Sequence, residues 1–145
     1  MQLLPETTWI DFFKDAGFTA KQIKDGEYRD EVSLTTIFRL YGDAIQYKDE
    51  GFTAFELKTA QVPINKIKSF GFSALELKEA NYSAKDLGTL VPKFNVGEML
   101  NAGFDLEELI NIYSMDDFKR ANVAVKDLKK QNLTDIQVKN LAATY

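Results

Sequence analysis

The sequence predicts an all-α protein: an α-solenoid-like stack of about thirteen short helices, each held with one tight turn in a ten-residue repeat. Three recurring features predict this fold. A large apolar residue and a helix-capping residue open most repeats, an apolar residue follows four positions after the cap, and Gly or Asn often closes the repeat. These features mark the start, the packed face and the end of one helix.

The ten-residue frame is clearest over residues 52–91, which read FTAFELKTAQ, VPINKIKSFG, FSALELKEAN and YSAKDLGTLV. Two insertions, at 28–31 and 92–93, and one deletion extend the frame over nearly the whole chain. The thirteen repeats are 8–17, 18–27, 32–41, 42–51, 52–61, 62–71, 72–81, 82–91, 94–103, 104–112, 113–122, 123–132 and 133–142. We therefore expect a single helical-repeat domain over 1–145, with bends near 28–31 and 92–93.

The positions of a repeat, numbered here as columns one to ten, predict where each helix starts. Column two is mostly Ser, Thr, Asp or Asn, and column five is mostly acidic or an amide, as in Thr53 with Glu56. This spacing is typical of a capping box, in which each of the two side chains accepts a hydrogen bond from the other residue's backbone amide. Columns one and six, such as Phe72 with Leu77 and Phe104 with Leu109, have the spacing of a hydrophobic staple.

The repeat leaves room for only about seven helical residues, and helices this short are marginal in water unless they pack against neighbours. Columns one, three, six and nine are apolar, which predicts one buried face per helix. Column nine alternates small and large residues: Ala60, Phe70, Ala80, Leu90, Ala102, Ile112 and Ala121. The alternation favours helix-turn-helix pairs of about twenty residues as the structural unit.

Two segments, EGFTAFELKTA and GFSALELKEAN, resemble the AGFSAKELKEAGF-type decapeptide short-helix repeat proteins. The resemblance covers nearly the whole chain. It implies the fold described above, and it implies no activity.

The composition of the chain excludes several kinds of chemistry. Cysteine and histidine are both absent, so disulfides, thiolate or imidazole metal sites and the common nucleophilic triads cannot form. The carboxylate pair Asp116–Asp117 is the most obvious remaining candidate for acid–base chemistry, but Asp117 also matches the capping position. We expect no enzyme activity and no cofactor.

Charge and hydropathy bear on partners and location. The net charge of −4, from 22 acidic and 18 basic residues, opposes general nucleic-acid binding. The N-terminal residues do not resemble a secretory signal, and no stretch approaches 18 consecutive apolar residues, so we expect a cytoplasmic protein that does not bind a membrane.

Apolar residues in columns expected to face outward are the candidate partner-binding residues. They are Ile45, Phe55, Leu75 and Ile136 in column four, and Phe38, Leu100 and Ile110 in column seven. If they are exposed, they predict a surface for another protein, with Phe55 near Leu75; alternatively, the repeats curl and bury them. The function predicted is a non-enzymatic protein–protein interaction or scaffold module. The alternative is a small inhibitor or ligand-sequestering protein, for example a viral one, that masks a target.

Lysines recur in column seven, namely Lys14, Lys24, Lys48, Lys58, Lys68, Lys78, Lys119, Lys129 and Lys139. They could form a ridge that holds phosphates. Carboxylates two residues earlier favour instead a solvated face of mixed charge.

Overall fold

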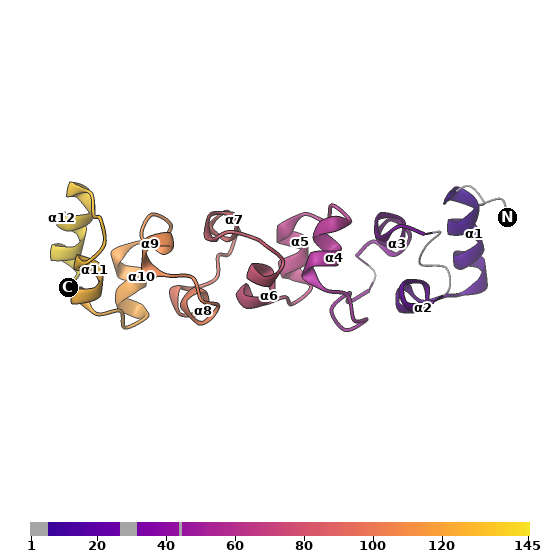
Figure 1. Ribbon diagram of the computed structural model, residues 1–145, viewed down its shortest axis with the longest axis horizontal. Coiled ribbons are helices and arrows are strands. Elements are labelled where there is room, and N and C mark those ends of the chain that lie inside the picture. Colours follow the sequence, from indigo (N-terminus) through magenta and orange to yellow (C-terminus); the bar gives the residue numbers. More distant parts are fainter. Residues whose placement is uncertain (1–5, 27–31, 44) are drawn as a thin grey trace. The chain divides into compact units, whose positions relative to one another are not determined.

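The computed structural model of the protein describes residues 6–26, 32–43 and 45–145, so the bend expected at 28–31 lies outside the described residues. These residues form twelve helices and no strand, which confirms the all-α prediction (Figure 1). The helices are α1 (Glu6–Ala16), α2 (Ala20–Asp25), α3 (Leu34–Tyr41), α4 (Ala54–Thr59), α5 (Ile64–Ser69), α6 (Ala74–Glu79), α7 (Ala84–Gly88), α8 (Val96–Asn101), α9 (Leu106–Leu109), α10 (Met115–Arg120), α11 (Val125–Lys129) and α12 (Asp135–Thr144).

The chain divides into two compact bodies, an N-terminal body, Met1–Phe72, and a C-terminal body, Ser73–Tyr145. In the N-terminal body α3 packs against α1, α2 and α4, and α5 packs against α4. In the C-terminal body α6 packs against α8, α7 against α9 and α10 against α12. Each of these last contacts joins a helix to the second helix along the chain, which is the contact expected between equivalent helices of successive repeat pairs in a stack. That one domain spans the whole chain stays a prediction.

The capping boxes are formed as predicted. In α4 the Thr53 hydroxyl accepts from the Glu56 amide at 3.1 Å, and a Glu56 carboxylate oxygen accepts from the Thr53 amide at 2.8 Å. The same reciprocal pair begins helices at Thr19, Ser73, Ser83, Asn95, Asp105, Ser114 and Thr134. Pro63 and Ala124 begin α5 and α11 without a side-chain cap. The start of most helices is therefore specified by two residues three positions apart.

The ends of the helices follow the prediction for column ten. Gly51 has φ +83° and Gly103 has φ +88°, the left-handed conformation in which a helix terminates with little steric cost to glycine. Asn81 and Asn122 adopt the same region at φ +65° and +59°. The chain therefore turns at a regular spacing, and each short helix packs against others in its own body.

The core is built from the columns predicted to be apolar. In a regular repeat such as 52–61, columns one, three, six and nine are buried, and column four is exposed. Column six is at most 2 % exposed in twelve repeats: Phe13, Ile23, Ile37, Tyr47, Leu57, Ile67, Leu77, Leu87, Met99, Leu109, Phe118 and Leu128. In the last repeat the column-six residue is Val138, and it is 51 % exposed. One face of the last repeat is therefore left uncovered within the described residues.

Repeat 42–51 forms turns rather than the helix expected there, so the number of helices is twelve instead of thirteen. Its first column holds Gly42, which cannot supply the large apolar side chain of a hydrophobic staple. Asp43, predicted as a cap, pairs with Lys66 at 2.5 Å instead. Tyr47 is still fully buried, and its hydroxyl donates to the Gly42 carbonyl at 2.7 Å.

Several lysines of column seven reach the second repeat along the chain, where they bind a backbone carbonyl near its end. The Nζ of Lys24 donates to the Gly51 carbonyl at 2.6 Å and lies 4.9 Å from the centre of the Phe52 ring. We call such a hydrogen bond, with its cation–π contact to the next residue, a rung. The other rungs are Lys48 on Gly71–Phe72 (3.1 and 5.6 Å), Lys78 on Gly103–Phe104 (2.5 and 4.9 Å), Lys93 on Ile112–Tyr113 (3.1 and 5.1 Å) and Lys119 on Thr144–Tyr145 (2.8 and 6.0 Å).

For Lys24, Lys48, Lys78 and Lys119, the rungs correct the expectation that the column-seven lysines form a solvated face of mixed charge. A lysine near the C-terminal end of a helix satisfies a carbonyl that has no partner inside that helix and interacts favourably with the helix dipole. Lys93 lies in the insertion at 92–93, and it supplies the rung that Gly88, in column seven of repeat 82–91, cannot. The insertion thus restores a contact that its repeat would otherwise lack.

Tyrosine hydroxyls add a second connection between repeats. Tyr113 donates to the Phe94 carbonyl at 2.5 Å, and Tyr145 donates to the Val123 carbonyl at 2.9 Å. Burial, followed by the charges of Asp117 and Glu98, raises the pKa of Tyr113 to about 12. Burial, followed by the charge of Asp43 and the nearby Tyr41, raises the pKa of Tyr47 to about 12.

These pKa values predict a loss of stability at alkaline pH. A tyrosine whose pKa is higher in the folded than in the unfolded chain stabilises the fold fully below about pH 10, the unfolded value, and that contribution is lost as pH rises toward 12. We expect the tyrosinate absorbance of the folded protein to develop in two stages, with Tyr47 and Tyr113 in the later one. Tyr113→Phe should remove part of the later stage, and an identical titration of folded and urea-denatured protein would contradict the assignment.

Candidate partner-binding surfaces

The seven candidate residues fall into two groups according to their column. Column four faces solvent: Phe55 on α4 is 54 % exposed, Leu75 on α6 is about half exposed, and Ile136 on α12 is 71 % exposed. Column seven is half-buried in most repeats, because it is the column of the rungs. Apolar residues in column seven therefore lie against the core, where a lysine stem lies in other repeats.

The three column-seven candidates are buried or half-buried in the structure. Ile110 is a buried core residue, so the prediction that it presents a partner-binding surface is wrong. Leu100 is half-buried. Phe38 is also half-buried, and its ring lies 5.6 Å from that of Tyr47. Ile45, a column-four residue, is half-buried because its repeat forms turns instead of a helix.

Phe55 is the clearest exposed apolar residue on a regular helix. The capping box of Thr53 and Glu56 fixes the start of α4, and Ala54 and Leu57 bury the opposite face of the helix. Phe55 therefore cannot turn inward without breaking the start of the helix. Leu75 occupies the equivalent position on α6. Since Phe55 belongs to the N-terminal body and Leu75 to the C-terminal body, their expected proximity stays a prediction.

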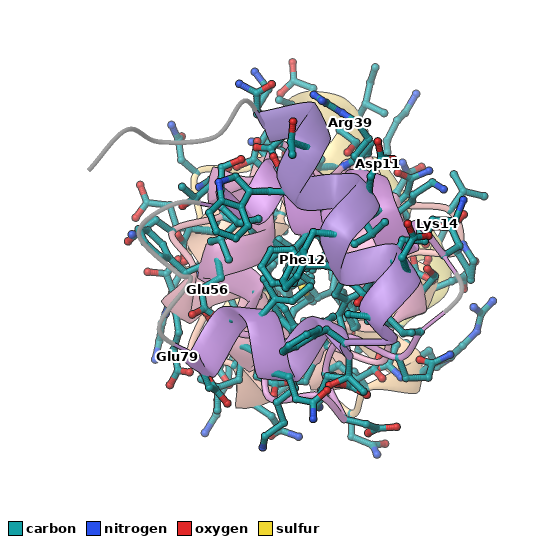
Figure 2. The ribbon with its side chains drawn as sticks, turned by 90° about the vertical axis from the view of Figure 1, so that its right-hand side faces the viewer. Asp11, Phe12, Lys14, Arg39, Glu56 and Glu79 are labelled. Atoms are coloured by element: carbon teal, nitrogen blue, oxygen red, sulfur yellow. The ribbon has the colours of Figure 1, made fainter. Side chains whose placement is uncertain are left out.

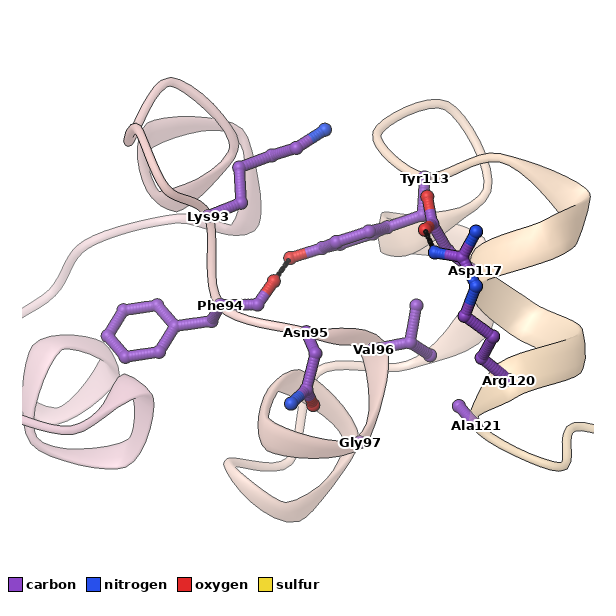
Figure 3. Close-up of a pocket in the computed structure, with 9 residues that line it drawn as sticks. All are labelled: Lys93, Phe94, Asn95, Val96, Gly97, Tyr113, Asp117, Arg120 and Ala121. Carbon is purple, nitrogen blue, oxygen red and sulfur yellow. Dashed lines mark hydrogen bonds and ion pairs between the residues drawn. The ribbon is translucent and has the colours of Figure 1, made fainter.

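A hollow of about 610 Å³ lies beside the insertion in the C-terminal body (Figure 3). Its lining includes Lys93, Tyr113, Asp117 and Arg120. These polar side chains already have partners within the C-terminal body. Lys93 and Tyr113 donate to backbone carbonyls, and the Arg120 Nη1 lies 3.3 Å from the Asp117 Oδ1. The hollow is thus lined by contacts that hold neighbouring repeats together.

Asp117 was the carboxylate that could have served acid–base chemistry. Burial alone would raise its pKa, but hydrogen bonds from the Ser114 amide and hydroxyl, together with the charges of Arg120 and Lys93, hold the pKa of Asp117 below its usual range. A carboxyl with a lowered pKa is ionised near neutral pH and is a poor proton donor. Its geometry is that of the capping residue of α10.

A second hollow, the C-terminal groove, was not anticipated from the sequence. It has a volume of about 580 Å³ between α11 and α12, and its lining includes Val125, Lys129, Leu133, Val138, Leu141 and Tyr145. Val138 matches the apolar pattern of column six, whose residues are buried in the other repeats. Its exposure therefore could not be predicted from the sequence. The repeat pattern gives the type of residue in each column, but it does not show whether a neighbouring helix covers that residue.

Two further observations limit the kinds of site. Among residues 6–26, 32–43 and 45–145, no three acidic side chains lie close enough together to hold a metal ion, and the chain has no His or Cys. No helix in the described part of the chain is long and apolar enough to cross a membrane.

The fold and these surfaces define a short-helix repeat protein. Residues 43–112 match the family model described as the decapeptide repeat region, which confirms the resemblance seen in the sequence. No curated protein and no solved structure matches the chain. Outside the matched residues, the capping boxes at Ser114 and Thr134 continue the same helix design toward the C-terminus.

Proposed function

We propose that the protein is a non-enzymatic interaction or scaffold module that presents exposed apolar side chains of its helical repeats to another protein. The exposure of Phe55 on a fixed helix face carries this proposal. A large aromatic side chain held in a solvent-facing column is typical of residues that contribute strongly to protein–protein binding.

The proposed location is the cytoplasm, which the complete absence of cysteine supports. The alternative, a protein that masks a target, would use the same exposed side chains. It differs in predicting one tight stoichiometric complex, whereas a scaffold binds several proteins.

A capture experiment tests the proposal. Phe55→Ser is expected to keep the helical circular dichroism of the protein, because its side chain contributes little to the core, and to reduce capture of its partners by about tenfold or more. Leu75→Ser tests the C-terminal body in the same way. Asn65→Ser is the matched control, since Asn65 is an exposed column-four residue of the N-terminal body. Equal capture by the wild-type protein, Phe55→Ser and Leu75→Ser would remove Phe55 and Leu75 as binding residues.

A further inference from the structure

The C-terminal groove has the form of a seat for one more repeat. In twelve repeats the column-six side chain is covered, whereas Val138, in the thirteenth, is 51 % exposed and lines the groove. Leu133 and Tyr145 lie beside it and are also partly exposed. The apolar side chains of the groove are therefore those that a repeat normally covers with its neighbour.

The groove also presents a rung donor that has no acceptor. Lys129 occupies column seven of repeat 123–132 and lines the groove, the position from which Lys78 and Lys119 reach a carbonyl in the second repeat along. Within the described part of the chain, Lys129 is exposed and has no hydrogen bond or ion pair. A ligand that completes the groove would place a carbonyl and an aromatic ring near this ammonium group, as in the five rungs already formed.

The matching acceptor is found near the N-terminus of the same chain. Gly17 closes repeat 8–17 with φ +72° and is followed by Phe18, the same Gly–Phe pair that accepts Lys24, Lys48 and Lys78 in other repeats. The Gly17 carbonyl accepts no hydrogen bond from the described residues. A hollow of about 510 Å³ adjoins this pair, lined by Asp11, Lys14, Arg39 and Tyr41 among others.

The surface around this acceptor is apolar as well. Phe12 on α1 is 45 % exposed, and Figure 2 shows it near the centre of the view, with Asp11, Lys14 and Arg39 to one side. Charge favours contact between the two surfaces. Residues 6–18 carry three acidic side chains and one lysine, and with Arg39 beside them the net charge is −1. Residues 123–145 carry four lysines and two aspartates, a net charge of +2.

We propose that the C-terminal groove binds the α1–Phe18 segment of a second copy of this chain, so that copies associate head to tail. Repeat 8–17 of the second copy then follows repeat 133–142 of the first. In this register Gly17 closes the second repeat after that of Lys129, which is the spacing of the existing rungs. Lys129 donates to the Gly17 carbonyl and lies over Phe18. The contact joins two different surfaces, so it leaves one of each free for the next copy.

Two variants block the two surfaces separately. Val138→Asp places a charge in the groove, and Phe12→Asp places one on the opposing surface; both side chains are about half exposed, so each variant should keep the circular dichroism of the wild type. By sedimentation analysis between about 10 µM and 1 mM, the wild-type chain should form dimers and larger species, and each variant alone should remain monomeric. An equimolar mixture of the two variants should form a dimer and nothing larger, since it retains one intact contact.

Further variants separate this proposal from the proposed function. Ile136→Asp is the matched control, because Ile136 is exposed on the same helix as Val138 but does not line the groove, and it should assemble as the wild type does. Lys129→Met should weaken the mixed dimer by about tenfold through loss of the rung. A monomeric wild-type chain over the whole range, a mixture that stays monomeric, or assembly that survives Val138→Asp would each overturn the proposal. None of these results bears on capture by Phe55.

Discussion

Leu128→Ala is expected to lower the free energy of unfolding of the C-terminal body by about 2–5 kcal/mol, whereas Val138→Ala should lower it by less than about 1 kcal/mol. Both residues occupy column six of adjacent repeats. Leu128 is fully buried, so its truncation leaves a cavity, while Val138 is half in water before any change is made. Position in the repeat is thus held constant. Truncation of Leu removes one carbon more than truncation of Val, about 1 kcal/mol when buried, so most of the expected difference comes from coverage by neighbouring residues.

Urea unfolding followed by circular dichroism measures this difference. It is best made at a protein concentration at which the chain is monomeric, because association would cover Val138 and raise the cost of its truncation. If Leu128→Ala and Val138→Ala lower the free energy of unfolding equally, coverage by neighbouring residues does not determine how much a column-six residue stabilises the fold.

Lys78→Met is expected to destabilise the C-terminal body by about 1–3 kcal/mol. The variant keeps most of the apolar stem but loses the hydrogen bond to the Gly103 carbonyl and the cation–π contact with Phe104. A hydrogen bond from a charged group contributes about 1.5–3 kcal/mol and an exposed cation–π contact about 0.5–1 kcal/mol. The lower part of the range applies because Lys78 is only half-buried.

Lys85→Met is the matched control for this measurement. Lys85 lies exposed in column four of the next repeat and forms no rung, so its replacement should change the free energy of unfolding by less than about 0.5 kcal/mol. Thermal or urea unfolding of the two variants side by side checks the difference. If Lys78→Met and Lys85→Met change the free energy of unfolding by the same small amount, the rungs do not contribute to stability.

Helix starts were predictable from the sequence because a capping box is local. Ser73 and Glu76 are three residues apart, and their side chains satisfy each other's backbone amides whatever the distant surroundings are. The failure at repeat 42–51 is also local in origin, since Gly42 lacks the side chain that a staple requires.

The rungs could not be predicted in the same way. Their acceptors are backbone carbonyls about 25 residues away, as in Lys78 with Gly103, and every residue carries such a carbonyl. From the sequence alone, column seven is therefore expected to face solvent, and its apolar residues cannot be told apart from those of column four. Knowing that column seven is half-buried separates Ile110, a core residue, from Phe55 and Ile136, which are exposed.

In each rung, the residue that carries the accepting carbonyl can be replaced more freely than the lysine that donates to it. Glycine at 51, isoleucine at 112 and threonine at 144 all serve as acceptors, because the accepting atom belongs to the main chain. Substitution at an acceptor leaves the oxygen in place, whereas substitution of the lysine removes the only donor. Each hydrogen bond therefore restricts only the lysine, and the cation–π contact adds a requirement for an aromatic residue after the acceptor. The residue that carries the accepting carbonyl can change in sequence while the helices keep the same neighbours.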